Sequence, residues 1–271
     1  MKTKIYIVAS CLFLVVPIQY TEAQVKDPPP DYRQVIQPHH LREADVMWSK
    51  RIWRAIDLRE KMNHPLYYPL ESKRTYKSLF DVVRDGIYEG TITAYDPIDD
   101  EFLNPMTRAE VKAKLESVDT VMIPNFETGE LEPMEVKTTI ESSDMRQYRI
   151  KEDWYFDKQL SVFEPQIIGI LLVAVKKDEM GNEVGNQALF WIYYPEARYV
   201  FANQLVYLRH NDVKITYADL FWRRFFSSYI YRESNVYDRA ISDYASGLSL
   251  QLESKRIHDV MFNFEHDLWE Y

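Results

Sequence analysis

A group of acidic and aromatic residues near the middle of the chain has the side chains needed for acid/base chemistry. Glu152, Asp153 and Asp157 surround the aromatic run 154–156. A glycosidase needs two carboxyl groups on opposite sides of a sugar, whereas carboxylates on one short segment point apart. We therefore expect these acids to act as salt-bridge and capping residues that let the neighbouring aromatic rings turn inward.

A second possibility at this segment is a surface on which sugar rings stack. The aromatic residues that could build it are Trp154, Tyr155, Trp191, Tyr193 and Tyr194. The chain holds 20 tyrosines and 6 tryptophans, and aromatic side chains at such density more often fill a core or a protein interface. The core or interface interpretation is favoured, which leaves Trp154 and Tyr155 as candidate partner-binding residues.

A third group combines two arginines with neighbouring aromatic residues. Trp222, Arg223 and Arg224 stand between Phe221 and the pair Phe225-Phe226 in a chain whose net charge is −9. Arginine and tryptophan dominate the binding energy of many interfaces. Two interpretations remain open: the aromatic residues are core and the arginines merely cover them, or Trp222, Arg223 and Arg224 contact a partner.

Other reaction centres find little support in the sequence. His39-His40 and His64 lack the spacing of a zinc site. The acidic segment 96–101 lacks the alternating ligands and central glycine of an EF-hand loop, so it is expected to be solvated. No nucleophile motif surrounds Ser227-Ser228, and the 7 glycines form no phosphate-binding loop. We expect no catalytic residue, no metal and no cofactor.

The N-terminus has the three regions of a secretory signal peptide. Lys2 and Lys4 precede the apolar run 5–18, and a small-x-small site ends at Ala23, so cleavage is expected between Ala23 and Gln24. A lipoprotein signal ending before Cys11 is the alternative. The apolar run continues past Cys11, which favours export of residues 24–271 without a lipid.

Export changes what the composition implies. Cys11 is the only cysteine, so the mature chain would have no disulfide and no thiolate nucleophile. Removing residues 1–23 takes away two lysines and one glutamate, which leaves an acidic surface that repels phosphates and disfavours nucleic acid as a partner. The apolar run 167–175 is far shorter than the roughly 20 residues that span a bilayer, so direct membrane insertion is not expected.

The helices and strands expected from the sequence, which must position these residues, indicate an α+β protein. Residues 24–40 form an extended, proline-rich leader and residues 41–271 a single compact domain with a central antiparallel hairpin or sheet, packed helices and a long C-terminal helix. Apolar periodicity and capping signals place the helices at 43–62, 76–87, 108–116, 195–203, 217–224 and 236–269. Strands are expected at 91–95, 121–124, 134–140, 167–175 and 188–194.

Three details make this prediction testable. The runs 167–175 and 188–194 should pair antiparallel at the core, and Thr216 should cap the helix that carries Trp222. The helix at 43–62 should bury one broad face, made by Trp48, Ile52, Trp53 and Ile56. The last helix should bury Ile241, Ala245, Leu248 and Leu252.

Several runs of the chain resemble a known family. They are DVMWSKRIWRAIDLREKMNHPLYYP, SLFDVVRDGIYEGTITAYDP, RIKEDWYFDKQLSVFEPQIIGI, LFWIYYPEARYVFANQ and LFWRRFFSSYIYRESNVYDR. In this order they look like the gliding-motility GldN / PorN family of the Bacteroidota type IX secretion system. The likeness covers most of residues 45–239 and thins beyond Arg239, where some relatives carry a longer extension.

The resemblance implies a structural, non-catalytic protein of the periplasm. It implies association with a GldK / PorK-like outer-membrane lipoprotein, with the periplasmic part of a GldM / PorM-like motor subunit, and with copies of itself in a ring. The charged aromatic segment around Trp154 would then be a packing or subunit seam. The alternative function is a free periplasmic carbohydrate-binding module or glycosidase-like enzyme.

Overall fold

The computed structural model describes residues 35, 37 and 40–269, except 74, 125–130, 178–181, 209–213 and 238. The expected cleavage site at Ala23 and Gln24, together with Cys11 and His39, lies outside these residues. Within the described residues no helix is both long enough and apolar enough to cross a membrane.

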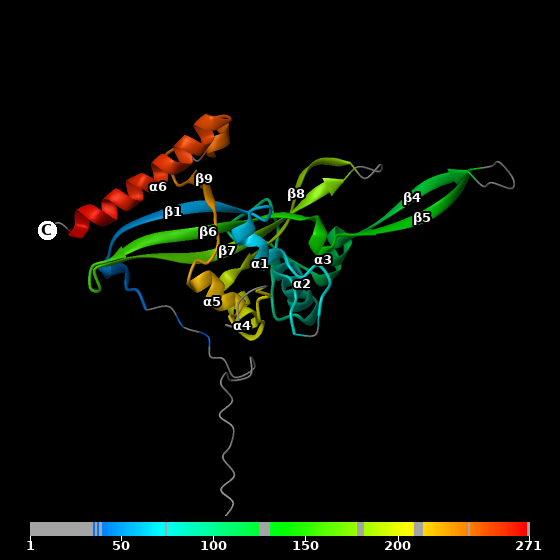
Figure 1. Ribbon diagram of the computed structural model, residues 1–271, viewed down its shortest axis with the longest axis horizontal. Coiled ribbons are helices and arrows are strands. Elements are labelled where there is room, and N and C mark those ends of the chain that lie inside the picture. The colour runs from blue at the N-terminus through cyan, green and yellow to red at the C-terminus, as the bar shows by residue number, and fades with distance from the viewer. Residues whose placement is uncertain are drawn as a thin grey trace, which may run out of the picture.

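A twisted antiparallel sheet forms the centre of the molecule (Figure 1). Its strands run in the order β3-β2-β8-β7-β6-β1-β9. Their bounds are β1 Val46–Asp57, β2 Ala94–Tyr95, β3 Pro105–Met106, β6 Met145–Asp157, β7 Val162–Lys177, β8 Glu183–Tyr193 and β9 Tyr229–Glu233. A separate hairpin, β4 Glu116–Pro124 with β5 Leu131–Thr139, extends away from this body.

Helices flank the sheet, and several begin at the capping residues that the sequence offers. The α-helices are α1 His64–Tyr67, α2 Leu79–Glu89, α3 Arg108–Leu115, α4 Tyr194–Asn203, α5 Tyr217–Trp222 and α6 Leu248–Trp269. Short 3-10 helices are η2 Glu43–Asp45, η3 Lys61–Asn63, η4 Ser142–Asp144 and η5 Ile241–Asp243. Thr216 and Asp219 form a capping box at the start of α5, which confirms the predicted cap.

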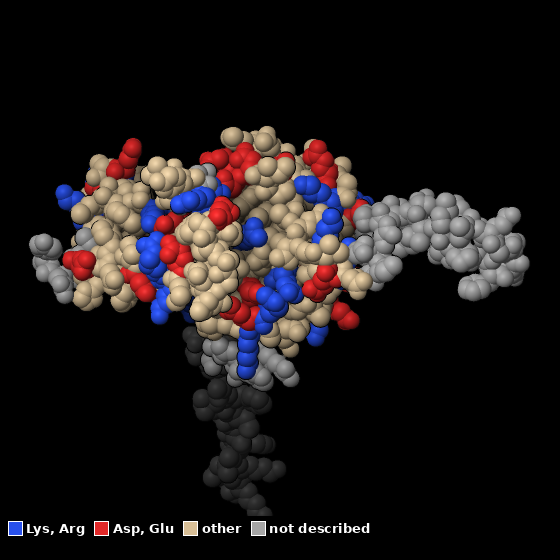
Figure 2. Space-filling model, turned by 90° about the horizontal axis from the view of Figure 1, so that it is seen from above, with Lys and Arg blue, Asp and Glu red and all other residues tan. Residues whose placement is uncertain are grey.

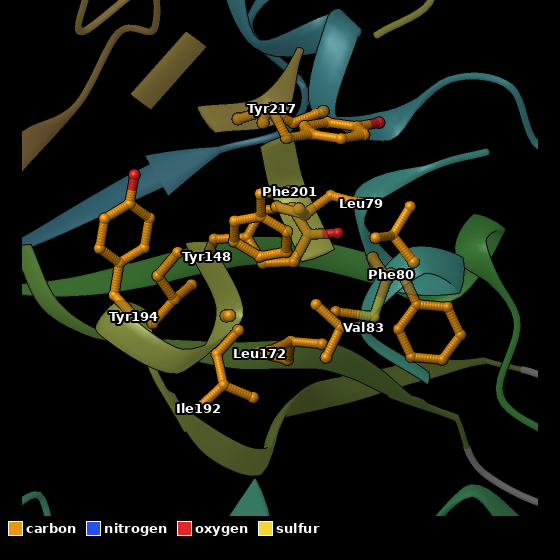
Figure 3. Packing of buried hydrophobic residues seen from close by; sticks show 14 of the residues in the cluster. Leu79, Phe80, Val83, Tyr148, Leu172, Ile192, Tyr194, Phe201 and Tyr217 are labelled. Carbon is orange, nitrogen blue, oxygen red and sulfur yellow. The ribbon is translucent and has the colours of Figure 1, made fainter. Parts of the chain in front are cut away.

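The main core lies where α2, α4 and α5 pack on the sheet (Figure 3). The side chains at its centre, all from β6, β7, β8 and these helices, include Leu79, Phe80, Val83, Tyr148, Leu172, Ile192, Phe201 and Tyr217. Each such side chain stabilises the fold by about 1.5 to 3 kcal/mol through removal of apolar surface from water.

Two smaller apolar clusters complete the body. α6 packs on β9 and β1 through Ile257 and Met261, which meet Ile52 and Ile230. On the other face of β1, Trp53 belongs to a cluster with Leu171, Val173 and Trp191. Because successive side chains of a strand point to opposite faces, neighbouring residues of β1 serve different clusters.

The predicted α+β class, the central antiparallel sheet and the long C-terminal helix are confirmed. Strands β7 and β8 pair antiparallel, as Ile170 opposite Ile192 illustrates. The helices expected at 76–87, 108–116 and 195–203 and the strands expected at 121–124 and 134–140 are present with shifted ends.

The helix expected at 43–62 is wrong, because this segment forms the strand β1. Residues 52–56 are all buried, since β1 lies inside the sheet and both of its faces are covered. A strand buried on both faces shows no alternation of polar and apolar residues. The sequence spacing of the bulky residues Trp48, Ile52, Trp53 and Ile56 then resembles the apolar face of an amphipathic helix.

The last helix begins later than expected, at Leu248 instead of near residue 236. Leu248 and Leu252, expected to be buried, are exposed. The face that α6 turns toward the sheet instead carries Leu250, Ser254, Ile257, Met261 and Phe264. Ile241 is buried as expected, but it lies in η5.

Candidate interaction site

Three consecutive charged residues occupy the middle of β6 and point to alternating faces of the sheet. Lys151 is only 2% exposed, and its Nζ donates to the backbone oxygen of Asp100 at 2.6 Å and to Glu101 Oε1 at 3.2 Å. Asp153 points to the same face as Lys151 and accepts from Arg51 Nε at 2.7 Å and Nη2 at 3.0 Å. Glu152 points to the opposite face.

Glu152 is the centre of a buried ion cluster. Its side chain is 0% exposed and lies 2.9 Å from Arg224 Nη1, through Oε1, and 3.4 Å from Arg54 Nε, through Oε2. The indole nitrogen of Trp154 donates to Oε2 at 3.0 Å. Burial lowers the pKa of Arg54, and the Glu152 carboxylate opposes that effect. One carboxylate is thus shared by two guanidinium groups, both of which also lie over the Trp154 ring.

The acids of this segment have the structural roles that the sequence predicts. Glu152 and Asp153 are ion-paired, and Asp157 caps a turn by accepting from the backbone nitrogens of Gln159 and Leu160 at 2.7 and 3.3 Å. Because Glu152 and Asp153 are adjacent in a strand, their carboxyl groups lie on opposite faces. They cannot flank one sugar.

Arg224 reaches Glu152 through an unusual backbone turn. Its φ is 52°, in the left-handed region, directly after α5. The N–H of Phe225 donates to the oxygen of Leu220 at 2.9 Å, and the N–H of Arg224 to that of Phe221 at 3.2 Å. These two bonds make a Schellman motif, whose left-handed position is usually glycine. An arginine there accepts about 1 kcal/mol of backbone strain and places its guanidinium on Glu152.

The same turn exposes a cationic aromatic surface. Trp222 is 54% and Phe225 47% exposed, and Arg223 between them is exposed as well. Phe221 and Phe226, by contrast, belong to the main core. We call Trp222, Arg223 and Phe225 the aromatic–arginine surface.

The interpretation of this segment as core aromatic residues covered by arginines is therefore only partly right. Phe221 and Phe226, at the two ends of the segment, are core, whereas Trp222 and Phe225 between them face solvent. Arg224 is not a free surface charge, because it pairs with a buried carboxylate. Binding of a partner by Trp222, Arg223 or Arg224 stays a prediction.

The other aromatic candidates do not share one surface. Trp154 lies under Arg54 and Arg224. Tyr155 is buried, and this burial raises the pKa of its hydroxyl. Trp191 belongs to the cluster around Trp53, whereas Tyr194 belongs to the main core. A sugar-stacking platform made by these residues together with Tyr193 is thus not formed.

The acidic segment 96–101 is more than a solvated loop, which corrects the expectation. The indole nitrogen of Trp53 donates to Asp100 Oδ2 at 2.8 Å, and Lys151 holds both Asp100 and Glu101. Sequence reasoning missed Arg54, Asp100 and Lys151 as members of these networks. Their partners lie about 50 or more positions away, so no local spacing could reveal them.

The described residues hold no group of three or more histidine, cysteine, aspartate or glutamate side chains arranged for a metal ion. His64, one of the histidines considered, packs edge-on against Tyr68 with ring centroids 5.5 Å apart.

The family model described as gliding motility associated protein GldN matches residues 41–270. A search among curated proteins finds no match to the chain.

Proposed function

Because the chain belongs to the GldN family of gliding motility associated proteins, we propose that it is a structural subunit of the type IX secretion and gliding machinery. In this proposal it is exported, resides at the inner face of the outer membrane, and is held there by a GldK / PorK-like lipoprotein. It associates with further copies of itself in a ring and with a GldM / PorM-like motor subunit.

The observation that carries this proposal is the aromatic–arginine surface. Two large aromatic rings flank an arginine on a turn that a Schellman motif and the Arg224–Glu152 pair hold rigid. Preorganised side chains lose little entropy on binding, and tryptophan and arginine are the types that anchor interfaces. The surface therefore fits a protein partner that offers apolar and acidic groups, and we assign that role to the lipoprotein.

The enzyme alternative has weaker support among the described residues. Glu152, Asp153 and Asp157 are each engaged by a cation or a backbone N–H. The aromatic candidates for sugar stacking are divided between separate clusters. A scaffold needs neither a free acid nor an open platform, and this agrees with a non-catalytic role.

Charge reversal at the exposed arginine tests the proposal. Arg223→Glu should fold normally, because a surface substitution usually changes the free energy of unfolding by only about 0.5 kcal/mol. It should nevertheless abolish co-purification with the lipoprotein from envelopes and block secretion. Circular dichroism, affinity purification and a secretion assay on the same variant measure this.

The matched control is Lys255→Glu, which makes the same charge change at an exposed position of α6. It should fold, assemble and secrete as the wild type does. Arg224→Glu is unsuitable, because it would place a second carboxylate against buried Glu152. A folded Arg223→Glu protein that still binds the lipoprotein would remove the aromatic–arginine surface from the interface.

A further inference from the structure

The outer face of α4 carries an apolar groove. The helix buries Tyr194, Ala197, Phe201 and Ala202 in the fold. Its outward residues, with one threonine from the turn before β2, line a groove of about 470 Å³: Thr91, Pro195, Glu196, Tyr199, Val200 and Asn203. Tyr199 is 53% exposed at this groove. A half-exposed tyrosine beside proline and valine is a surface that an extended peptide can cover.

Two hydrogen bonds place Gln37, which precedes the domain, beside this groove. The side-chain amide of Gln37 donates to the Tyr199 hydroxyl at 3.3 Å and accepts from Arg198 Nη2 at 3.1 Å. Val35 is half-buried although it belongs to no helix or strand. Arg198 Nε is buried and has no hydrogen-bond partner among the described residues.

We infer that the α4 groove is the docking site of the chain's own proline-rich leader, residues 28–37. Proline-rich segments adopt the polyproline II conformation without internal hydrogen bonds and bind aromatic-lined grooves at low entropic cost. At about 3.1 Å per residue, the stretch from Pro30 to Gln37 covers roughly 22 Å, which exceeds the roughly 15 Å length of α4. The leader can therefore follow the helix from end to end.

The tether favours the chain's own leader over a free peptide. Gln37 is covalently joined to β1 through the eight residues 38–45, so the leader is held beside the groove at an effective concentration in the millimolar range. Tyr199 and Val200 supply apolar contact for the proline rings, and Arg198 supplies N–H groups for backbone oxygens. This inference does not depend on the function proposed above.

Trypsin cleavage between Arg33 and Gln34 tests the inference on protein that carries the complete leader. A docked leader is cleaved only in its undocked fraction, so Tyr199→Ala should raise the cleavage rate about ten-fold and Tyr199→Phe by less. Tyr237→Ala, at an exposed tyrosine outside the groove, should leave it unchanged. Circular dichroism confirms that each variant is folded.

The outcomes separate the possible occupants. Protection that does not change with protein concentration supports docking of the chain's own leader. Protection that increases with concentration would show that a neighbouring copy's leader fills the groove, which overturns the assignment. Equal cleavage of wild type and Tyr199→Ala would show that the leader does not occupy the groove at all.

Discussion

Glu152 illustrates how a single charged residue can be built into a protein interior. Removing a carboxylate from water costs several kcal/mol, and its attraction to nearby cations offsets this only when the geometry is good. Here Arg54, Arg224 and the Trp154 indole surround both oxygens. Removing the carboxylate would leave Arg54, itself buried, beside a second positive charge.

At this scale we predict that Glu152→Ala lowers the free energy of unfolding by about 3 to 5 kcal/mol, the usual cost of breaking a buried pair. Asp153→Ala, one position along the same strand, is the matched control. Its pair with Arg51 is about one-third exposed on both sides, so its loss should cost no more than about 1 kcal/mol. Urea unfolding of the two variants measures the difference. Similar losses in both would show that burial of Glu152 does not decide its contribution.

Only part of the arrangement of the candidate site could be predicted from the sequence. Residue type alone selects Trp222, Arg223 and Arg224 as candidates, and their binding of a partner stays a prediction. It could not tell which of them face solvent, because α5 ends at an arginine instead of the glycine that usually marks such a turn. The inward direction of Arg224 depends on Glu152, which is 72 positions away.

Among the elements, those defined by local signals were predictable and those defined by tertiary burial were not. α2 begins at Ser78, whose side chain accepts from Asp81 N, and ends at Gly90 with φ 83°. These caps can be read from the sequence. β1 has no such signal, and both of its faces are buried only because β6, β9 and the packed clusters surround it. β6 and β9 are also missing from the predicted strands, because charged residues interrupt their apolar pattern.

The position of the 96–104 loop depends on a single glycine, Gly169. Phe102, with φ 58°, folds the segment after the acidic loop onto β7, where a Cβ at Gly169 would lie 2.3 Å from its Cζ. The ring also meets Tyr95, Trp191 and Tyr193. Phe102 thus holds the 96–104 loop against the sheet.

We predict that Gly169→Ala displaces Phe102, lowers the free energy of unfolding by about 1 to 3 kcal/mol as overpacking does, and speeds amide hydrogen exchange in residues 96–104. Gly185→Ala in β8 is the control, because a Cβ there meets nothing within 4 Å. Exchange in the loop that remains as slow as in the wild type would show that the ring adapts without releasing the loop.

Basic and acidic side chains are interspersed across the face of the molecule seen in Figure 2. The net charge of −9 therefore does not arise from one acidic region on that face. Buried tyrosines, such as Tyr148 and Tyr217 in the main core, join the helices to the sheet.

Because these tyrosines are buried, we predict that the protein loses stability at alkaline pH. Burial raises the pKa of Tyr194 and Tyr231 to about 12, and raises the pKa of Tyr148 and Tyr217 strongly as well. An unfolded tyrosine ionises near pH 10, so above that pH the unfolded state releases protons that the folded state keeps. Rising pH then favours unfolding.

We expect ionisation of these tyrosines to leave the free energy of unfolding unchanged below about pH 9. Between about pH 10 and 12, the free energy of unfolding should fall steadily. Urea titrations at several pH values, with tyrosinate absorbance recorded alongside circular dichroism, measure this. Tyr217→Phe should reduce the slope, whereas Tyr237→Phe, at an exposed position, should not. Ionisation of all tyrosines near pH 10 without unfolding would contradict the prediction.

The register of the sheet has a mechanical consequence. β6 is paired with β1 as far as Asp157 and with β7 along its whole length, and hydrogen bonds in such ladders lie perpendicular to the strands. Tension along β6 would load both ladders in shear, so that many bonds must rupture together. β9 is a short strand at the edge of the sheet, paired with β1, and α6 packs against it. A pull on the C-terminal end would therefore peel β9 and α6 away one bond at a time, while the sheet behind them still carried load.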